Sequence, residues 1–365
     1  MDKAAFFTTL AIREKTKIHA WYFLNQGSFV HPSLNHFQIH GLNALLLLSL
    51  EQPVDLCKFL KIPLIQLEQI INNPSYQYFT IAKKQGGIRE ILAPEEELKK
   101  IQKHLNYYLQ AWYLCVKPEE VHGFVINPHY LGEYCNIVAN ASIHVGKKYV
   151  LNLDLKDFFP GISAHRVREL FLSDVFRFGN QIATAMTLLT TFKGILPIGA
   201  PTSPVISNFI CLQLDADLIS YCENHHLSYS RYADDLTFSS NEVITPEITG
   251  ELINLIQLNN FAVNSRKTRL TSFNRRQTVT GLTVNEKVNI DRKLLKKIRA
   301  MLHDLSINGI TSATRNHFNI SGDVQPEMME KFHHKLAGYI NFIGQVRGRS
   351  DALFLKFRDL HEVKN

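Results

Sequence analysis

The sequence contains no long apolar run, and this absence argues against a membrane-spanning protein. The longest uninterrupted apolar stretch is Ala44 to Leu48, whereas a membrane-spanning helix needs roughly 20 such residues. The first residues, Met1-Asp2-Lys3, are not followed by the apolar segment and small-residue cleavage site of a secretory signal. We therefore expect a cytoplasmic protein.

Cysteine is also scarce. The 365 residues include 5 cysteines, and no two of them form a C-x-x-C pair. This number is too low for a disulfide-rich scaffold, and the spacing does not suit a zinc site. We expect thiols in a reducing cytosol at Cys57, Cys115, Cys135, Cys211 and Cys222.

No repeat period or low-complexity tract is present, which excludes a solenoid and long flexible linkers. The remaining composition is that of a globular protein, with 45% hydrophobic and 20% charged residues. Lys and Arg number 40 against 33 Asp and Glu, a net charge of +7. This balance favours a polyanionic partner, but it is a weak signal alone, because many basic proteins bind nothing anionic.

Local patterns indicate a helical start followed by a basic hairpin. The stretch to about Pro74 has leucines at helical spacing. Tyr78–Ala82 and Ile88–Leu92 are predicted strands, joined by the turn Lys83-Lys84-Gln85-Gly86-Gly87. Pro94 is expected to open the next helix, with three acids in its first turn.

Two later elements place carboxylates at strand ends. Residues 148–155 form an apolar strand that ends near Asp154, and residues 228–239 form a hairpin with Asp234 and Asp235 at its tip. Helices are predicted between them at 165–176 and 180–191, so the order is that of a split β-α-β sheet. From Val288 onward the pattern is helical and basic, with helices expected at 292–303 and 326–343.

The three acids suit metal-dependent phosphoryl chemistry. A single Asp at a strand end is most often a turn former. Asp154, however, follows a strand too apolar to be exposed, and Asp234-Asp235 puts two like charges into another such strand. Two Mg²⁺ ions about 3.5–4 Å apart, held by carboxylates of neighbouring strands, would neutralise them and serve nucleotidyl transfer.

Three sequence blocks resemble those of reverse transcriptases. Tyr232-Ala233-Asp234-Asp235 matches their Y-A-D-D signature, Asn152–Phe159 resembles their first catalytic block, and Leu196–Pro204 resembles their L-P-x-G-x-P-x-S-P block. The resemblance covers roughly Tyr78 to Leu282. It implies an α+β, right-hand polymerase with fingers, a split β-α-β palm and a helical thumb. It also implies an RNA-directed DNA polymerase that uses two Mg²⁺ ions, or Mn²⁺.

This resemblance suggests a division of the chain. We expect a helical N-terminal region at 1–75, fingers at 76–147, a palm at 148–284 with a fingers-type insertion at 165–200, and a helical, RNA-binding thumb at 285–365.

Motif matching then assigns roles to single residues. Asp154, Asp234 and Asp235, with Leu155, would be the metal-binding positions. Lys84 and Arg89 resemble residues that grip the triphosphate of a dNTP; a solvated charged turn is the alternative. Phe159 falls at the family's steric gate against the ribose 2′-OH, and a plain core aromatic is the alternative. Gly199 and Pro201 fit a loop that admits template or nucleotide, and Ile198 replaces the common Gln.

Further signatures resemble those of retron reverse transcriptases. Asn140-Ala141-Ser142-Ile143-His144 matches their N-A-x-x-H element, Val279-Thr280-Gly281 matches their V-T-G element, and Val121-His122-Gly123-Phe124 also follows their pattern. We expect Asn140, His144 and the V-T-G residues to contact RNA, with a structural role for His144 as the alternative. Retron enzymes, by this resemblance, bind a noncoding RNA (msr-msd) and prime from the 2′-OH of a guanosine. Their product is RNA-linked msDNA, and many act with a separate effector protein against phage.

The distribution of charge supports RNA binding independently. No acid occurs from Leu252 to Asn285, while basic residues accumulate there and on the next predicted helix. Cations at this density suit phosphate contacts with an RNA stem, although a solvated basic face is the alternative. The expected RNA-binding cations are Arg266, Lys267, Arg269, Arg275, Arg276, Lys293, Lys296 and Lys297.

Three other functions compete with this prediction. A group II intron-type enzyme would normally add a maturase region and often an H-N-H endonuclease, and neither pattern occurs before Asn365. An RNA-binding scaffold with a relic palm would not need three clustered carboxylates. A cyclase or nuclease would share the metal chemistry, but the basic Gly-Gly hairpin and the 196–204 loop favour a polymerase.

Overall fold

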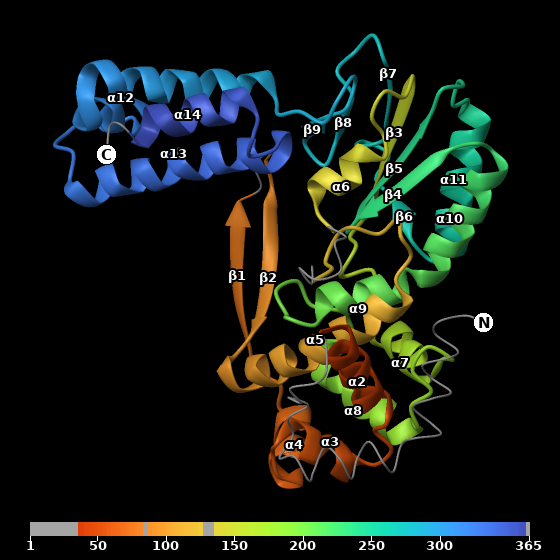
Figure 1. Cartoon of the computed structure of the whole chain (residues 1–365). Helices are drawn as coiled ribbons and strands as arrows, with labels where there is room; N and C mark the ends of the chain where they lie inside the picture. Colours follow the sequence, from red (N-terminus) through yellow and green to blue (C-terminus); the bar gives the residue numbers. More distant parts are fainter. Residues whose placement is uncertain (1–35, 83–85, 127–134, 363–365) are drawn as a thin grey trace. The chain divides into compact units, whose positions relative to one another are not determined.

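The computed structural model describes residues 36–82, 86–126 and 135–362 (Figure 1). The chain divides into two compact units. Unit 1 comprises Met1–Cys135, Leu153–Leu236 and Thr245–Thr268, and unit 2 comprises Asn136–Asn152, Thr237–Ile244 and Arg269–Asn365. The division falls within strands β3 (Tyr149–Lys156) and β5 (Asp235–Ser240), so each of these strands contributes residues to both units.

Helices form most of unit 1. The long helix α5 (Glu96–Val116) packs against α2 (His36–Leu48), α8 (Asn180–Thr190) and α9 (Ser203–Ile210). Apolar residues at helical spacing on α5, from Leu98 to Trp112, are buried and build the core. The remaining helices of the unit are α3 (Pro53–Leu60), α4 (Leu64–Asn72), α7 (Ala164–Leu172), α10 (Leu212–Asn224) and α11 (Pro246–Leu258).

The expected basic hairpin is present as an antiparallel pair, β1 (Tyr76–Ala82) and β2 (Ile88–Pro94), in the register Tyr76↔Pro94 to Ala82↔Ile88. One local expectation was wrong: Pro94 does not open the helix but ends β2, and α5 begins after Glu95, whose backbone is extended. Proline lacks an N–H and favours extended backbone before it, so it suits a strand end as well as a helix start.

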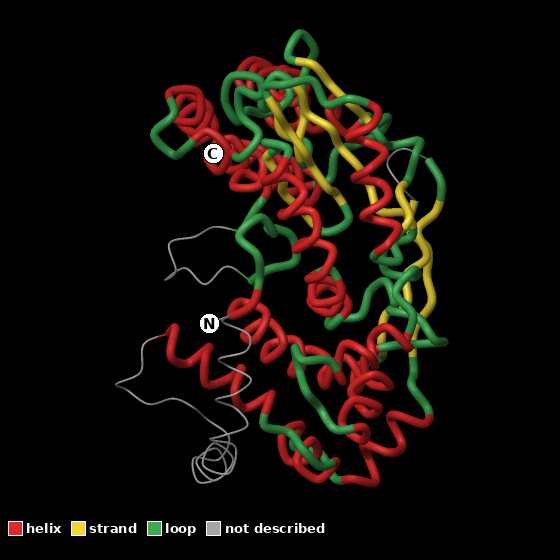
Figure 2. Tube along the Cα trace, turned by 90° about the vertical axis from the view of Figure 1, so that its right-hand side faces the viewer, coloured by secondary structure: helices red, strands yellow, loops and turns green. Residues whose placement is uncertain are grey.

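The central sheet has the strand order β4-β5-β3-β6, with β7 also paired with β3. Strands β4 (Ser228–Tyr232) and β6 (Ala262–Val263) belong to unit 1, and β7 (Arg269–Ser272) belongs to unit 2. Figure 2 shows the strands in yellow, in a view turned by 90° from that of Figure 1. The last residues of β3 pair antiparallel with β6 (Leu155↔Val263), whereas its first residues pair with β7 (Tyr149↔Ser272). Asp154 therefore lies beside β6.

Unit 2 contains a helical C-terminal part, as the sequence predicted. Its core cluster joins α12 (Arg292–Phe318), α13 (Pro326–Arg347) and α14 (Ala352–Glu362) through buried apolar residues such as Phe332 and Leu336. Helix α12 is longer than expected and contains a kink at Gly309, which has φ 73° and ψ 174°. The Asp304 carboxylate, in the first half, accepts a hydrogen bond from Asn316 of the second half at 3.0 Å and so links the two halves across the kink.

A small local element precedes these helices. Helix α6 (Ile137–Ser142) packs on the hairpin of β8 (Thr278–Val279) and β9 (Leu282–Thr283). Thr280 and Gly281 form the turn of this hairpin, and both have positive φ (47° and 83°). Thr280 Oγ1 donates to the Ile137 carbonyl at 3.2 Å, so the N-A-x-x-H and V-T-G motifs build one local element.

Within the described ranges, no single helix is long and apolar enough to cross a membrane. Helices α9 and α10 reach the required length and hydropathy only as a pair, across a bend of 48°. None of the five cysteines forms a disulfide.

Candidate active site

The turn between β4 and β5 carries two of the three predicted acids, Asp234 and Asp235. Ala233, which precedes them, has φ 59°, a left-handed conformation that is uncommon for a residue with a side chain. Gly123 supports this turn from behind: a Cβ atom at position 123 would lie 2.3 Å from the Ala233 nitrogen. Only glycine therefore allows the two backbones to approach this closely.

A buried ion pair also holds this turn. Arg231 and Asp215 are both fully buried, and the guanidinium donates to the two carboxylate oxygens at 2.7 and 2.6 Å. Arg231 Nη1 also donates to the Ala233 carbonyl at 3.2 Å and to Asn208 Oδ1 at 2.9 Å. The left-handed residue before Asp234 is thus tied to α9 and α10 through Arg231.

Protonation states in this network are fixed by its geometry. Burial alone would lower the pKa of Arg231, but the adjacent Asp215 carboxylate raises it well above its ordinary value. Burial and the same carboxylate raise the pKa of Tyr229, so its hydroxyl stays protonated and donates to Asp215 at 2.8 Å. Asp215 therefore accepts three hydrogen bonds, two of them from a cation, and such pairing is what stabilises a buried carboxylate.

Asp154 lies next to the turn. The Leu155 amide, one residue further along β3, donates to the Asp234 carbonyl at 2.9 Å, and the Asn264 amide donates to the Asp154 carbonyl at 2.8 Å. The side chain of Leu155 is buried. These backbone bonds bring the three predicted acids to one place, although Asp154 precedes Asp234 by 80 residues (234 − 154).

The carboxylate of Asp154 already has cationic and polar partners. Lys267 Nζ donates to Oδ1 at 2.7 Å, and Asn264 Nδ2 contacts Oδ2 at 3.3 Å. The hydrogen bond from Lys267 to Asp154 raises the pKa of Lys267, which therefore stays charged. Sequence reasoning placed Lys267 among RNA-binding cations; in the structure it is the counter-ion of a predicted catalytic acid.

The acids repel one another. Desolvation raises the pKa of Asp235 to about 6, and the charges of Asp234 and Asp154 add to this effect, although the side chain keeps contact with solvent. The pKa of Asp234 is also raised, first by burial and then by Asp154. A set of carboxylate oxygens with unbalanced negative charge is the donor set that a hard divalent cation prefers.

These residues fit divalent cations by their chemistry. In the described part of the chain, no three acidic, His or Cys side chains are already arranged as a closed metal-ligand cluster. Asp154 is instead occupied by Lys267. Binding of a cation at Asp154 would therefore replace an existing ion pair.

The predicted nucleotide-binding residues differ in how they relate to the three acids. Arg89 is exposed on β2, and its charge lowers the pKa of Asp234, so it acts on the same site. Lys84 lies outside the described residues. Gly199 has φ 115°, and its close neighbour is β2: a Cβ there would lie 2.8 Å from Ile91 Cγ2.

The 196–204 loop is fixed by backbone contacts. The Leu92 amide of β2 donates to the Ile198 carbonyl at 2.7 Å, and Ser203 Oγ donates to the Pro197 carbonyl at 2.7 Å. Gly199 therefore allows the loop to join the basic hairpin, and Pro201 follows it half-buried. The Ile198 main chain makes this contact, which does not depend on the side chain at that position.

The predicted gate residue Phe159 is half-buried in an aromatic cluster. Its ring centroid lies 5.3 Å from that of Phe158 and 5.7 Å from that of Phe124. Phe158 in turn stacks on Phe261, which precedes β6. Phe159 is therefore not a fully buried core residue.

Two predicted RNA contacts lie in the interior of unit 2. Asn140 and His144 are buried, and His144 Nδ1 is 2.7 Å from Ser239 Oγ. Neither side chain is exposed, which favours the structural role that is the alternative for His144. Their positions instead support the α6–β8–β9 element, in which Val279 is buried and Gly281 is exposed.

The remaining predicted cations are exposed, and some have partners. Arg269 donates to Thr278 Oγ1, Arg276 pairs with Asp291 at 2.8 Å, and Lys297 Nζ lies 5.7 Å from the Tyr339 ring centroid. Besides Lys267, which is also exposed, the exposed members of the predicted set are Arg266, Arg269, Arg275, Arg276, Lys293, Lys296 and Lys297.

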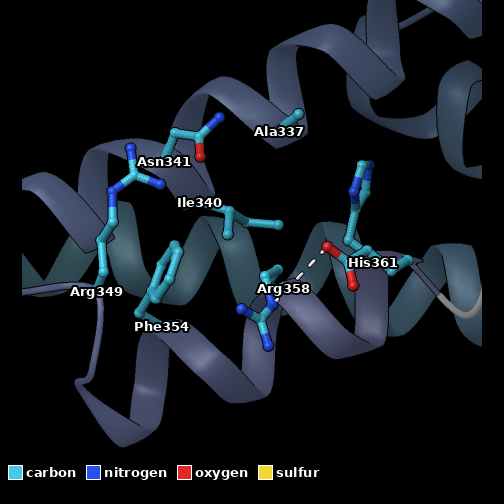
Figure 3. A pocket seen from close by; sticks show the side chains of 8 residues that line it. Ala337, Ile340, Asn341, Arg349, Phe354, Arg358 and His361 are labelled. Carbon is cyan, nitrogen blue, oxygen red and sulfur yellow. Dashed lines mark ion pairs between the residues drawn. The ribbon is translucent and has the colours of Figure 1, made fainter.

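A surface pocket of about 340 Å³ lies between α13 and α14 (Figure 3). It is lined by Phe354, His361 and Arg349, among others, and Arg358 at its edge pairs with Glu362 at 3.8 Å. None of the predicted site residues lines it.

Sequence reasoning missed Arg231, Asp215 and Asn264. An arginine in the middle of a short strand, directly before the Y-A-D-D signature, was an available signal for Arg231, because a charge that becomes buried requires a partner. Asp215 and Asn264 have no comparable signal, since their partners lie 16 and 110 residues away.

Comparison with known proteins identifies the class. Residues 81–290 match the family described as reverse transcriptase (RNA-dependent DNA polymerase), and the chain belongs to this family. Membership confirms the α+β, right-hand polymerase fold class that the motifs predicted.

Within that class, the chain belongs with the retron reverse transcriptases. It is 32% identical over 280 residues to the retron Ec86 reverse transcriptase of Escherichia coli, which covers 74% of this chain and 82% of that enzyme. It is 35% identical over 263 residues to the retron Mx65 enzyme of Myxococcus xanthus, over 67% of this chain but only 59% of the relative. A solved telomerase structure from Candida albicans is a distant neighbour, with 10% identity and a TM-score of 0.43 over 81% of this chain and 64% of that one.

Proposed function

We propose that the chain is the RNA-directed DNA polymerase of a retron. It would copy part of its cognate noncoding RNA (msr-msd) into RNA-linked single-stranded DNA (msDNA), starting from a 2′-OH primer. The observation that carries the proposal is the convergence of Asp154, Asp234 and Asp235 on neighbouring strands, beside the cation Lys267. Family membership supports the reaction type.

In this proposal the three acids hold Mg²⁺ ions, with Mn²⁺ as the alternative. Bound divalent cations would lower the pKa of the attacking hydroxyl and neutralise charge on the leaving pyrophosphate. The protein supplies the frame: Arg231 and Gly123 fix the turn that bears Asp234, and the Leu155 amide fixes its distance from β3. A frame that is already ordered needs no reorganisation during the reaction.

The fingers hairpin would position the dNTP. Arg89, with Lys84, would bind the triphosphate, and Phe159 would exclude a ribose 2′-OH. Gly199 and the Ile198 carbonyl keep the 196–204 loop joined to β2, which supports the placement of Arg89 near the acids, and Pro201 would line the same loop. We retain the proposed division into an N-terminal region (1–75), fingers (76–147), palm (148–284) and thumb (285–365).

RNA would be bound by the exposed cations of unit 2 and by Arg266. The buried Asn140 and His144 would act indirectly, by supporting the V-T-G hairpin. On the family resemblance we also propose cytoplasmic action with a separately encoded effector protein, in anti-phage defence.

The test uses isosteric replacements of the acids. Asp234→Asn and Asp235→Asn, made together, should lower dNTP incorporation on the co-purifying RNA at least about a thousandfold, because the variants lose the carboxylate charges that would hold the ions. Each tenfold step corresponds to about 1.4 kcal/mol of lost transition-state stabilisation. Asp174→Asn, at an exposed surface acid, is the matched control. Undiminished synthesis would contradict the assignment of the acids. Sequencing of the co-purifying nucleic acid tests the retron part, since a 2′,5′-linked RNA–DNA hybrid is expected.

A further inference from the structure

The segment Val121–Phe124 contacts two parts of the proposed site. One is the turn that bears Asp234 (the catalytic turn), and the other is the predicted gate residue Phe159. Val121 forms a parallel bridge with Arg231, the His122 amide donates to the Arg231 carbonyl at 3.0 Å, and Gly123 lies against Ala233. The next residue, Phe124, places its ring 5.7 Å from that of Phe159, at an interplanar angle of 38°. Four consecutive residues thus contact both parts of the site.

Phe124 is held in a conformation that it would not adopt alone. Its φ is 60°, in the left-handed region that residues with a β-carbon rarely occupy. Such a conformation persists only where the surroundings enforce it, and such residues cluster at functional sites.

The enforcing residue is Gln110 on α5, whose side chain is buried. Its Nε2 donates to the Phe124 carbonyl at 2.9 Å, and its Oε1 accepts from the Ile126 amide at 3.3 Å. One side-chain amide therefore binds the backbone on both sides of Val125, which fixes the chain from which the Phe124 ring projects.

The ring of Phe159 is confined by two aromatic neighbours. Phe158 and Phe124 both lie at centroid distances typical of attractive aromatic pairs. Phe158 is the preceding residue in the chain, but Phe124 is 35 residues away (159 − 124), and its segment is held by Gln110, by the turn that bears Asp234 and by Asn208, whose amide donates to the Gly123 carbonyl at 3.0 Å. A ring that discriminates one hydroxyl group must be fixed closely relative to the reacting atoms.

We propose that Phe124, clamped by Gln110, is a positioning residue for sugar selection: it fixes the Phe159 ring relative to the turn that bears Asp234. This inference rests on the proposed function, in which Phe159 is the gate. It predicts that selectivity for dNTPs depends on a residue that does not itself contact the sugar.

The experiment compares dGTP with GTP on the full chain, with an RNA template and single-turnover kinetics. Phe159→Ala should lower the ratio of the two kcat/KM values about tenfold or more, and Phe124→Ala about three- to tenfold. The double variant should discriminate no less than Phe159→Ala alone, because residues that act as one unit are not additive. Phe124→Leu, which keeps apolar bulk, should have an intermediate effect and guards against misfolding of the Ala variant.

Gln110→Met tests the clamp, since it keeps the shape but removes both hydrogen bonds. It should lower the selectivity ratio in the same direction, whereas Gln257→Met, at an exposed position on α11, should not. Thermal unfolding shows whether the Phe124 variants are folded. The proposal is overturned if Phe159→Ala relaxes selectivity for dNTPs while folded Phe124→Ala and Phe124→Leu retain it. If Phe159→Ala itself retains selectivity, the assignment of Phe159 as the gate in the proposed function is wrong. If selectivity then changes in Phe124→Ala alone, Phe124 does not act through Phe159.

Discussion

Lys267 is the residue whose interpretation changes most between sequence and structure. Its charge and its place in an acid-free tract predicted contact with RNA, but its ammonium group binds Asp154 at 2.7 Å. Without divalent ions it supplies positive charge where three carboxylates meet. The same charge must compete with any cation that binds there.

Removal of this charge should strengthen divalent cation binding. Lys267→Met eliminates the competitor at Asp154 and leaves the carboxylates less neutralised. The Mn²⁺ concentration at the midpoint of binding should therefore fall about tenfold. This factor is smaller than for a buried charge, because Lys267 is half-exposed and solvent screens it. Mn²⁺ titration followed by electron paramagnetic resonance, without substrate, measures the midpoint. Lys267→Arg keeps the charge and is the control; a raised or unchanged midpoint in Lys267→Met would contradict this role.

At this scale the sequence predicts which acids matter but not their partners. Asp154, Asp234 and Asp235 stand in short motifs that chemistry makes recognisable. Lys267 and Asp154 are 113 residues apart, and their contact depends on the pairing of β3 with β6. A local pattern carries no information about such a contact.

At the scale of elements, the buried pair of Arg231 and Asp215 joins β4 to α10. Replacing one member leaves a charge without a partner, which typically costs about 3–5 kcal/mol, whereas replacing both by apolar residues costs less. Arg231 of the pair also donates to the Ala233 carbonyl, so the effects of the pair on stability and on the turn that bears Asp234 can be measured separately.

We expect Asp215→Leu to lower the free energy of unfolding by about 3–5 kcal/mol, and addition of Arg231→Met to recover part of that loss. The double variant should remain impaired in polymerisation, because the Ala233 carbonyl has lost its donor. Urea unfolding and a dNTP incorporation assay measure the two effects. A double variant less stable than Asp215→Leu would mean that the pair stabilises the fold beyond neutralising its own charges.

Several elements follow from sequence patterns, and others do not. The β1–β2 hairpin was predicted because its Gly-Gly turn lies between two short segments rich in β-branched and aromatic residues. The extension of α12 past His303 was not, since Gly309 interrupts the helical pattern and the Asn316–Asp304 hydrogen bond that links the two halves joins residues 12 positions apart. Likewise, two motifs 135 residues apart gave no sign that they form the single α6–β8–β9 element (279 − 144).

At the scale of the whole molecule, the net charge of +7 is less informative than its distribution. Cations of the β1–β2 hairpin belong to unit 1, together with the acids that offset them. The exposed lysines at the start of α12 belong to unit 2 and have few acidic neighbours in sequence. This second group is the better candidate for phosphate contacts.

Neutralising Lys293, Lys296 and Lys297 together should weaken binding of the structured RNA. The slope of log K against log salt should fall in magnitude by about 2–3, because each lost phosphate contact removes roughly 0.7–0.9. Filter binding or fluorescence anisotropy across a salt series gives the slope. Neutralising Lys58, Lys100 and Lys103 of unit 1 changes the net charge equally and is the control; equal slopes in the two triple variants would exclude a specific surface.

Gly123 has a consequence for attempts to engineer this polymerase. It has no reactive group, yet any side chain there would collide with the backbone of Ala233. A library randomised over residues 121–124 and selected for polymerase activity should therefore contain glycine alone at position 123, and several amino acids at position 124. Engineers who seek altered substrate range should diversify around this fixed point and leave it unchanged.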